Sequence, residues 1–365
     1  MAAAGAVASA QTFASASTES LRLRTTADQW PRKVIVGSAM QRFWVDHPGL
    51  ELRLKELTEL VDEMAEQSEK RYGRRLDLAI LPETAVSGDP NMGRSCPFWK
   101  DRGDNRGSGS DIMACAVPYE GLVKETFARK ARQQGCYIVA PLYLLDDIDS
   151  KLCSNAAVLV DRKGQTVGIY RKVHVAVSLE TGLLEGGTTP GKDVPVFDCD
   201  FGKLGIQICF DIQFDRGWQE LARRGAELVA WPTQSPQTAR PAFYAMQHRY
   251  YVVSSTWRHN ASVFEPTGRI AAQIKPPEQV LTHELDLSYA ILPWSHRLKS
   301  GEGLKEVYGD KVGYRYYEEE DRGIFWSNDR NITIGEMAKA LGVIELEQGL
   351  QDVRKLYAKA GVPGY

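Results

Sequence analysis

The stretch KLGIQICFDIQFDRGWQEL, from Lys203 to Leu221, carries most of the information about the fold. Its apolar run, Leu204 to Cys209, predicts a buried strand that ends in a thiol. A lone cysteine in such a place is usually a small buried hydrophobe, and a reactive one needs a positive charge nearby to form its thiolate. Two acids follow, Asp211 and Asp215, which we expect to order the loop and to cap the next helix.

Two other polar side chains also follow apolar strands. Lys172 lies in RKVHV at the end of a predicted hairpin strand, and Glu83 lies in LPETAVSG, directly after Pro82. Taken singly, the lysine is typical of a solvated strand end and the glutamate of a turn. Together with Cys209 they supply a cation, a base and a thiol, which is what acyl transfer to sulfur requires. Strand ends of α/β sheets are also where sites are built.

Helices and strands alternate along most of the chain. The predicted strands are 33–40, 76–83, 137–145, 227–232 and 251–256, the predicted helices are 50–64, 122–131, 218–224 and 239–249, and the predicted hairpins turn at 161–164, near Gly202 and at 266–269. Parallel β-α-β units mixed with hairpins indicate a mixed sheet covered by helices, an α/β fold. The end of the chain shows no strand alternation and finishes in a helical pattern over 336–361.

Three motifs give this chain a family resemblance. LPE at 81–83, YRKVH at 170–174 and GIQICFD at 205–211 resemble the Glu, Lys and Cys signatures of the nitrilase superfamily of carbon–nitrogen hydrolases. The resemblance implies a four-layer αββα sandwich with a C-terminal extension, and the catalytic triad Glu83, Lys172 and Cys209. The family's second glutamate is matched to Glu180, eight positions after the lysine, with Glu185 as a neighbouring competitor. The resemblance implies no cofactor and no metal.

The same resemblance predicts the substrate class. The nucleophile is followed by Phe210 and Asp211, whereas true nitrilases resemble Cys-Trp-Glu at this point. We therefore expect hydrolysis of a small amide or N-carbamoyl compound through a cysteine thioester. Many amidases continue with Phe-Pro-Glu, and this chain departs from that pattern with Phe214 and Asp215. Nitrile hydrolysis, acyl transfer to an amine, an ammonia-supplying amidase domain and a non-catalytic scaffold remain alternatives. A serine hydrolase is disfavoured because no GxSxG elbow occurs.

The predicted domain plan has three parts. Residues 1–30 are expected to be a disordered leader or the remnant of an export signal, 31–290 the carbon–nitrogen hydrolase domain, and 291–365 a C-terminal extension. The extension is rich in aromatic residues: Trp294, Tyr308, Tyr314, Tyr316, Tyr317, Phe325 and Trp326. Because so much aromatic surface is unfavourable in water, we expect the extension to lie at the interface of a homodimer or larger homo-oligomer; the alternative is that it packs on its own subunit.

Composition excludes several classes of partner. The formal net charge of −2 gives no bulk attraction to nucleic acid or to a membrane surface, and no apolar run approaches the roughly 18 residues of a membrane span. The six cysteines form no CxxC pair and the six histidines show no metal-ligand spacing.

We expect a cytoplasmic protein, or an exported one if the N-terminus is a truncated signal. The segments 94–109, 231–241 and 256–260 are candidates to line the pocket.

Overall fold

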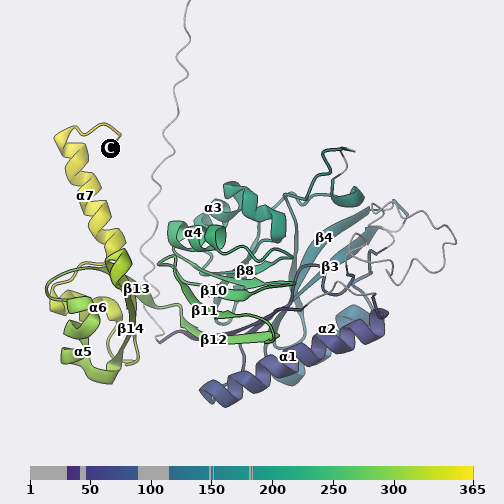
Figure 1. The fold of residues 1–365 in the computed structure, drawn as a ribbon, viewed down its shortest axis with the longest axis horizontal. Helices are drawn as coiled ribbons and strands as arrows, with labels where there is room; N and C mark the ends of the chain where they lie inside the picture. The colour runs from purple at the N-terminus through teal and green to yellow at the C-terminus, as the bar shows by residue number, and fades with distance from the viewer. Residues whose placement is uncertain are drawn as a thin grey trace, which may run out of the picture.

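Two stacked β-sheets form the centre of the molecule, and helices cover both outer faces (Figure 1). The structure is a computed structural model that describes residues 31–41, 47–88, 115–147, 149–150, 152–180, 182 and 184–364. The predicted leader (1–30) and the predicted pocket segment 94–109 lie outside these residues. The order of layers is helix, sheet, sheet, helix, which confirms the αββα sandwich.

The first sheet has six strands in the spatial order β12-β1-β2-β3-β4-β5. Their bounds are β1 (Lys33–Ala39), β2 (Leu78–Ile80), β3 (Tyr137–Asp147), β4 (Leu152–Val160), β5 (Thr166–Arg171) and β12 (Val280–Asp286). Strands β1, β2 and β3 are parallel, and the other neighbours pair antiparallel. The carboxyl ends of the parallel strands therefore lie at one edge of the sheet.

The second sheet repeats this plan. Its order is β11-β10-β9-β8-β7-β6, with bounds β6 (Val196–Cys199), β7 (Gly202–Ile206), β8 (Leu228–Pro232), β9 (Tyr251–Ser255), β10 (Ala261–Phe264) and β11 (Ile270–Ile274). Strands β7, β8 and β9 are parallel and the other pairs are antiparallel. The sequence pattern predicts one mixed sheet, whereas the structure has two sheets built alike.

Four helices complete the sandwich. Helices α1 (Leu50–Tyr72) and α2 (Leu122–Gln134) pack on the first sheet, and α3 (Asp215–Arg223) and α4 (Ala239–His248) pack on the second. The apolar stripe predicted for α1 is buried at Leu54, Leu57, Val61 and Met64. Gly73 caps the end of the helix with a left-handed φ of 61°, a conformation that glycine adopts easily because it has no Cβ. A third core fills the space between the two sheets.

The C-terminal extension, whose sequence shows no strand alternation, contains a small sheet of its own. The sheet order is β13-β15-β14, with β13 (Tyr289–Pro293), β14 (Val312–Tyr317) and β15 (Arg322–Ser327). Three helices pack with it or follow it: α5 (Glu302–Tyr308), α6 (Ile334–Leu341) and α7 (Leu346–Ala360). On β15, Ile324 joins the core between the large sheets and Phe325 joins the core of the extension. A strand buried on both faces shows no alternation.

This C-terminal module, residues 289–364, lies beside the sandwich, and α7 projects from it (Figure 1). Its sheet begins at Tyr289, two residues before the predicted boundary.

Across the residues that the structure describes, none of the helices combines the length and apolarity that a membrane crossing requires.

Candidate active site

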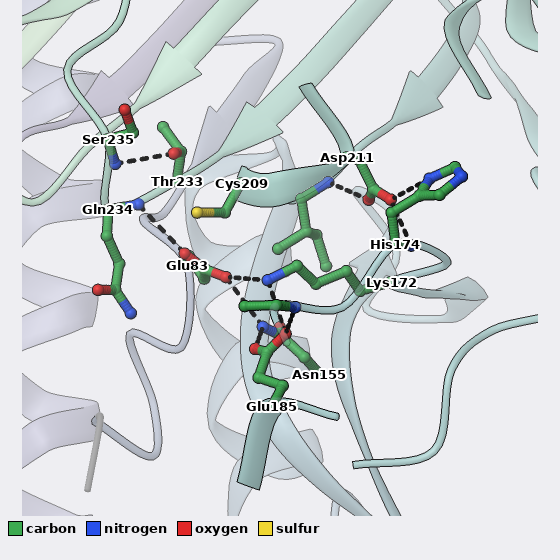
Figure 2. A network of polar contacts seen from close by, with 12 residues as sticks. Glu83, Asn155, Lys172, His174, Glu185, Cys209, Asp211, Thr233, Gln234 and Ser235 are labelled. Atoms are coloured by element: carbon green, nitrogen blue, oxygen red, sulfur yellow. Dashed lines mark hydrogen bonds and ion pairs between the residues drawn. The ribbon is translucent and has the colours of Figure 1, made fainter. Parts of the chain in front are cut away.

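Three strand ends bring the predicted triad together. Glu83 lies three residues after β2, Lys172 directly after β5, and Cys209 three residues after β7. The first two strands belong to one sheet and the third to the other, so the site spans the carboxyl edge of both sheets. Figure 2 shows the Cys209 sulfur pointing toward Glu83, with Lys172 on the other side of that carboxylate. These three residues form the candidate catalytic centre.

The Glu83 carboxylate is buried and held on both oxygens. Its Oε1 accepts hydrogen bonds from Lys172 Nζ at 2.9 Å and from Asn155 Nδ2 at 2.9 Å. Its Oε2 accepts the backbone N–H of Gln234 at 3.2 Å, and the Cys209 thiol lies beside the carboxylate (Figure 2). The Trp257 indole donates to the Glu83 carbonyl at 2.8 Å. Because the donors come from several elements, the carboxylate has one fixed orientation beside the thiol.

The backbone at the site is strained in three places. Cys209, Thr84 and Glu185 all have positive φ, at 39°, 52° and 37°. Residues other than glycine avoid this region of φ, and such strain persists only where surrounding contacts hold the backbone in place. Cys209 opens a short 3-10 turn (Cys209–Gln213), and its carbonyl accepts the Trp231 indole at 3.2 Å. The predicted strand thus ends at Ile206, and the turn presents the thiol beyond it.

The structure places Glu185, and not the predicted Glu180, against Lys172. Glu180 is exposed. Glu185 Oε2 lies 2.9 Å from Lys172 Nζ and accepts the Ala176 N–H at 3.0 Å. Position counting selects Glu180, whereas the loop folds back through a bridge between Val177 and Leu184 and so brings Glu185 to the lysine.

Burial and charge set the protonation states. Burial raises the pKa of Glu83; Lys172 opposes this shift and the negative charge of Glu185 adds to it. Burial alone would lower the pKa of Lys172, but attraction to Glu83 and Glu185 outweighs it and raises that pKa well above its ordinary value. Burial, together with the charge of Glu83, raises the pKa of the Cys209 thiol to about 12. The resting site therefore holds a charged lysine and a neutral thiol.

Sequence reasoning missed Asn155, which lies in the middle of β4. Its Nδ2 donates both to Glu83 Oε1 and to Glu185 Oε1, at 2.9 and 2.6 Å, and so ties the two carboxylates together. A polar residue inside the apolar strand LCSNAAVLV was the available signal. Of the predicted pocket segments, 231–241 contributes the Gln234 N–H and 256–260 contributes the Trp257 indole.

Sequence comparisons identify the family of the chain. The carbon–nitrogen hydrolase family model matches residues 47–292. Omega-amidase NIT2-A of Xenopus laevis is 27% identical over 253 residues, which cover 59% of this chain and 89% of that relative. Beta-ureidopropionase of Arabidopsis thaliana is 26% identical over 226 residues, covering 55% of this chain and 53% of that relative.

Solved structures share the fold. Nit3 of Saccharomyces cerevisiae, a member of the nitrilase superfamily, superposes with a TM-score of 0.55 at 19% identity, over 70% of this chain and 90% of that chain. An amidase from Nesterenkonia sp. superposes with a TM-score of 0.53 at 20% identity, over 69% of this chain and 90% of that chain. The chain is therefore a carbon–nitrogen hydrolase, an enzyme that belongs to the nitrilase superfamily.

Proposed function

We propose that this enzyme hydrolyses the carbon–nitrogen bond of a small amide or N-carbamoyl compound through a thioester on Cys209. One observation carries the proposal: the thiol lies beside a buried carboxylate, Glu83, whose Oε1 is held by Lys172 and Asn155. This arrangement pairs a nucleophile with a base and places a cation next to both.

The first half-reaction moves one proton from sulfur to nitrogen. Cys209 Sγ bonds to the substrate carbonyl carbon while its proton passes to Glu83, because a thiol with a pKa of about 12 does not ionise by itself near pH 7. The carbonyl oxygen becomes an oxyanion, which Lys172 Nζ and the backbone N–H of Phe210 stabilise. Glu83 then gives the proton to the leaving nitrogen, the C–N bond breaks, and the thioester remains.

The second half-reaction uses the same groups in reverse. Glu83 takes a proton from water, the hydroxide adds to the thioester carbon, and the proton returns to Cys209 sulfur as the acid leaves. Lys172 acts only as a charge: its pKa is raised well above the ordinary value, so it holds its proton throughout. Glu185 holds Lys172 against this site by an ion pair at 2.9 Å.

A substrate panel tests the proposal. Purified enzyme is incubated with simple amides, N-carbamoyl amines and nitriles, and released ammonia or amine is measured. We expect the largest kcat/KM for an amide or N-carbamoyl compound, in keeping with the Cys-Phe-Asp sequence and with the names omega-amidase and beta-ureidopropionase among the relatives. Faster turnover of nitriles would contradict the amide assignment, and preferred transfer to an added amine would favour an acyltransferase.

Replacing Glu185 by glutamine is expected to lower kcat/KM by about 10²-fold, because an amide nitrogen then faces Lys172 or Asn155 and a charged hydrogen bond is lost. The same change removes a negative charge that raises the pKa of Glu83. Glu83 must be deprotonated to accept the thiol proton, so the acid limb of kcat/KM should move to lower pH.

The matched control is Glu180→Gln, which changes the same chemical group on the same loop at an exposed position. Activity within about two-fold of wild type, with an unmoved acid limb, is expected for it, as for surface substitutions generally. The reverse ranking of the two variants would return the second-glutamate role to Glu180.

We also propose that the enzyme assembles as a homo-oligomer through α7. None of its residues is buried, and an apolar stripe with spacings of four, three and four runs along it: Leu346, Leu350, Val353 and Tyr357. This spacing is typical of a helix that packs against another helix. The first half of α7 and its cap carry acids and the second half carries basic residues: Glu345, Glu347, Asp352, Arg354, Lys355 and Lys359. Antiparallel pairing with a second copy would set each acidic half against a basic half.

Light scattering at micromolar concentration checks the assembly. Wild type should exceed the monomer mass, and Leu350→Glu/Val353→Glu should lower the mass, since charges would enter the apolar stripe. Leu52→Glu, at an exposed leucine of α1, is the matched control and should leave the mass unchanged. A monomeric wild type would contradict the assembly, and a double variant of unchanged mass would exclude α7 as the interface.

A further inference from the structure

We propose that Asp211 is a positioning residue that fixes the position of Cys209 relative to Lys172 across the two sheets. This inference rests on the function proposed above. The side chain of Asp211 does not point to the thiol. Figure 2 shows it on the side of Cys209 away from Glu83, between the turn that carries Cys209 and the segment that carries Lys172. We call Asp211 with its partners Tyr170, His174 and Ile208 the Asp211 clasp.

The clasp is a fully buried carboxylate with four donors. Asp211 has no exposed surface. Its Oδ2 accepts the Tyr170 hydroxyl at 2.7 Å and the Ile208 N–H at 2.9 Å. Its Oδ1 accepts the His174 backbone N–H at 2.8 Å and lies 3.0 Å from His174 Nδ1. Each oxygen therefore has two hydrogen-bonding partners, so neither oxygen is available to bind a substrate.

The donors come from both catalytic segments. Tyr170 and His174 flank Lys172 on either side, and Ile208 immediately precedes Cys209. Strand β5, which leads to the lysine, lies in the first sheet, whereas β7, which leads to the cysteine, lies in the second. A single carboxylate thus connects the Tyr170 hydroxyl and the His174 backbone, which lie on either side of the lysine, to the backbone N–H that precedes the nucleophile.

The backbone of Asp211 is itself anchored. Its carbonyl accepts the Trp218 indole at 3.0 Å and the Phe214 N–H at 3.1 Å, which fixes the turn to the start of α3. This anchoring explains how Cys209 keeps its positive φ of 39°, because a strained residue persists only where its neighbours are over-determined. Release of the clasp would let the turn relax and the thiol move relative to Lys172.

Small displacements matter at such a site. A misplacement of about 1 Å between reacting groups reduces the rate by roughly 10²-fold. An ionised carboxylate is purely an acceptor, and all four partners can donate to it. Asparagine has nearly the same shape but carries an NH₂ group, which must face either the Ile208 and Tyr170 donors or the His174 donors. In either orientation the NH₂ group that Asp211→Asn introduces therefore faces a backbone N–H that can only donate, that of Ile208 or of His174, while the volume of the side chain is kept.

The test compares Asp211→Asn with Asp215→Asn. Asp215 is four residues away, and its side chain is 61% exposed, which makes the second variant a matched control. For Asp211→Asn we expect kcat to fall by at least about 30-fold with KM changed less than three-fold, since the substrate contacts remain and the reacting groups shift. The control should stay within about two-fold of wild type.

A second readout needs no substrate. The rate at which iodoacetamide alkylates Cys209 at pH 7, followed by mass spectrometry of the Cys209 peptide, reports how well Glu83 and Lys172 assist the thiol. Asp211→Asn should slow alkylation by at least about ten-fold, in line with lost alignment of the base. Should the wild type hydrolyse nothing in the panel, the proposed function fails, and alkylation still decides the clasp.

Tyr170→Phe covers the case in which Asp211→Asn does not fold. It removes one hydroxyl that donates to Oδ2 and keeps the buried ring. Slower alkylation of the folded Tyr170→Phe protein, beyond that of Asp215→Asn, supports the clasp. If the folded variants lose thermal stability alone, with kcat and the alkylation rate equal to those of the control, Asp211 is a purely structural residue and the proposal is wrong.

Discussion

Cys209→Ala and Cys209→Ser are both expected to lose hydrolysis by at least ~10³ in kcat while the protein remains folded, which is the scale on which a covalent nucleophile contributes. Serine is expected to fail as well as alanine because Glu83 has to remove the proton of the nucleophile. A hydroxyl is a much weaker acid than a thiol, so Glu83 cannot deprotonate it as readily. Neither change removes a large buried side chain, so circular dichroism and the thermal midpoint should stay close to wild type.

Cys199→Ser is the matched control for this experiment. Cys199 lies at the end of β6 and is also partly exposed, but it makes no contact with Glu83 or Lys172 in the described structure. It should retain full activity. Mass spectrometry of wild type mixed with a slow amide substrate should reveal an acyl adduct on Cys209. Substantial activity in either Cys209 variant would rule out the thioester route.

The sequence made Glu83, Lys172 and Cys209 candidates because each follows a predicted strand, and the family resemblance implied that they form a catalytic triad. An apolar run shows where a strand lies, and the polar residue just after it belongs to the carboxyl edge of a sheet. Glu83, Lys172 and Cys209 satisfy this rule, and the structure brings them together. The layer order was predicted by family resemblance, since the sequence pattern does not distinguish one mixed sheet from two sheets of the same plan.

Loops and doubly buried strands were less predictable. Glu185 and Glu180 lie in one loop, and only the three-dimensional path of that loop decides which carboxylate meets Lys172. Asn155 acts through two hydrogen bonds that link residues far apart in the sequence. Strand β15 was missed because its two faces pack into different cores, which removes the alternation by which strands are recognised.

An ion pair whose carboxylate is fully buried joins the C-terminal module to the sandwich, and Arg315→Met is expected to lower the free energy of unfolding by about 3 kcal/mol, the scale for leaving a buried charge without its partner. Arg315 on β14 donates to Glu265 Oε2 from Nε at 2.9 Å and from Nη2 at 2.6 Å. Glu265 lies in the turn between β10 and β11 and has no exposed surface. Methionine keeps the length of the side chain, so the loss reports the charge.

Trp326 offers the measurement, because its ring lies 5.0 Å from the Arg315 guanidinium. Urea unfolding followed by tryptophan fluorescence should give a lower midpoint for Arg315→Met. The control is Arg269→Met, whose side chain is 38% exposed and pairs with the exposed Glu319; it should lose less than about 1 kcal/mol, as surface pairs do.

A double variant separates the buried charge from lost packing. Glu265→Gln/Arg315→Met removes both charges, so it should recover most of the stability that Arg315→Met loses. Thr267 still donates to the amide oxygen that replaces Glu265 Oε1, which it contacts at 2.7 Å in the wild type. If the double variant is as unstable as Arg315→Met, the module is held by packing of Ile324 and Trp326 against the central core and not by the ion pair. If Arg315→Met unfolds at the wild-type midpoint, neither charge contributes to docking, and the module is joined to the sandwich by its apolar face alone.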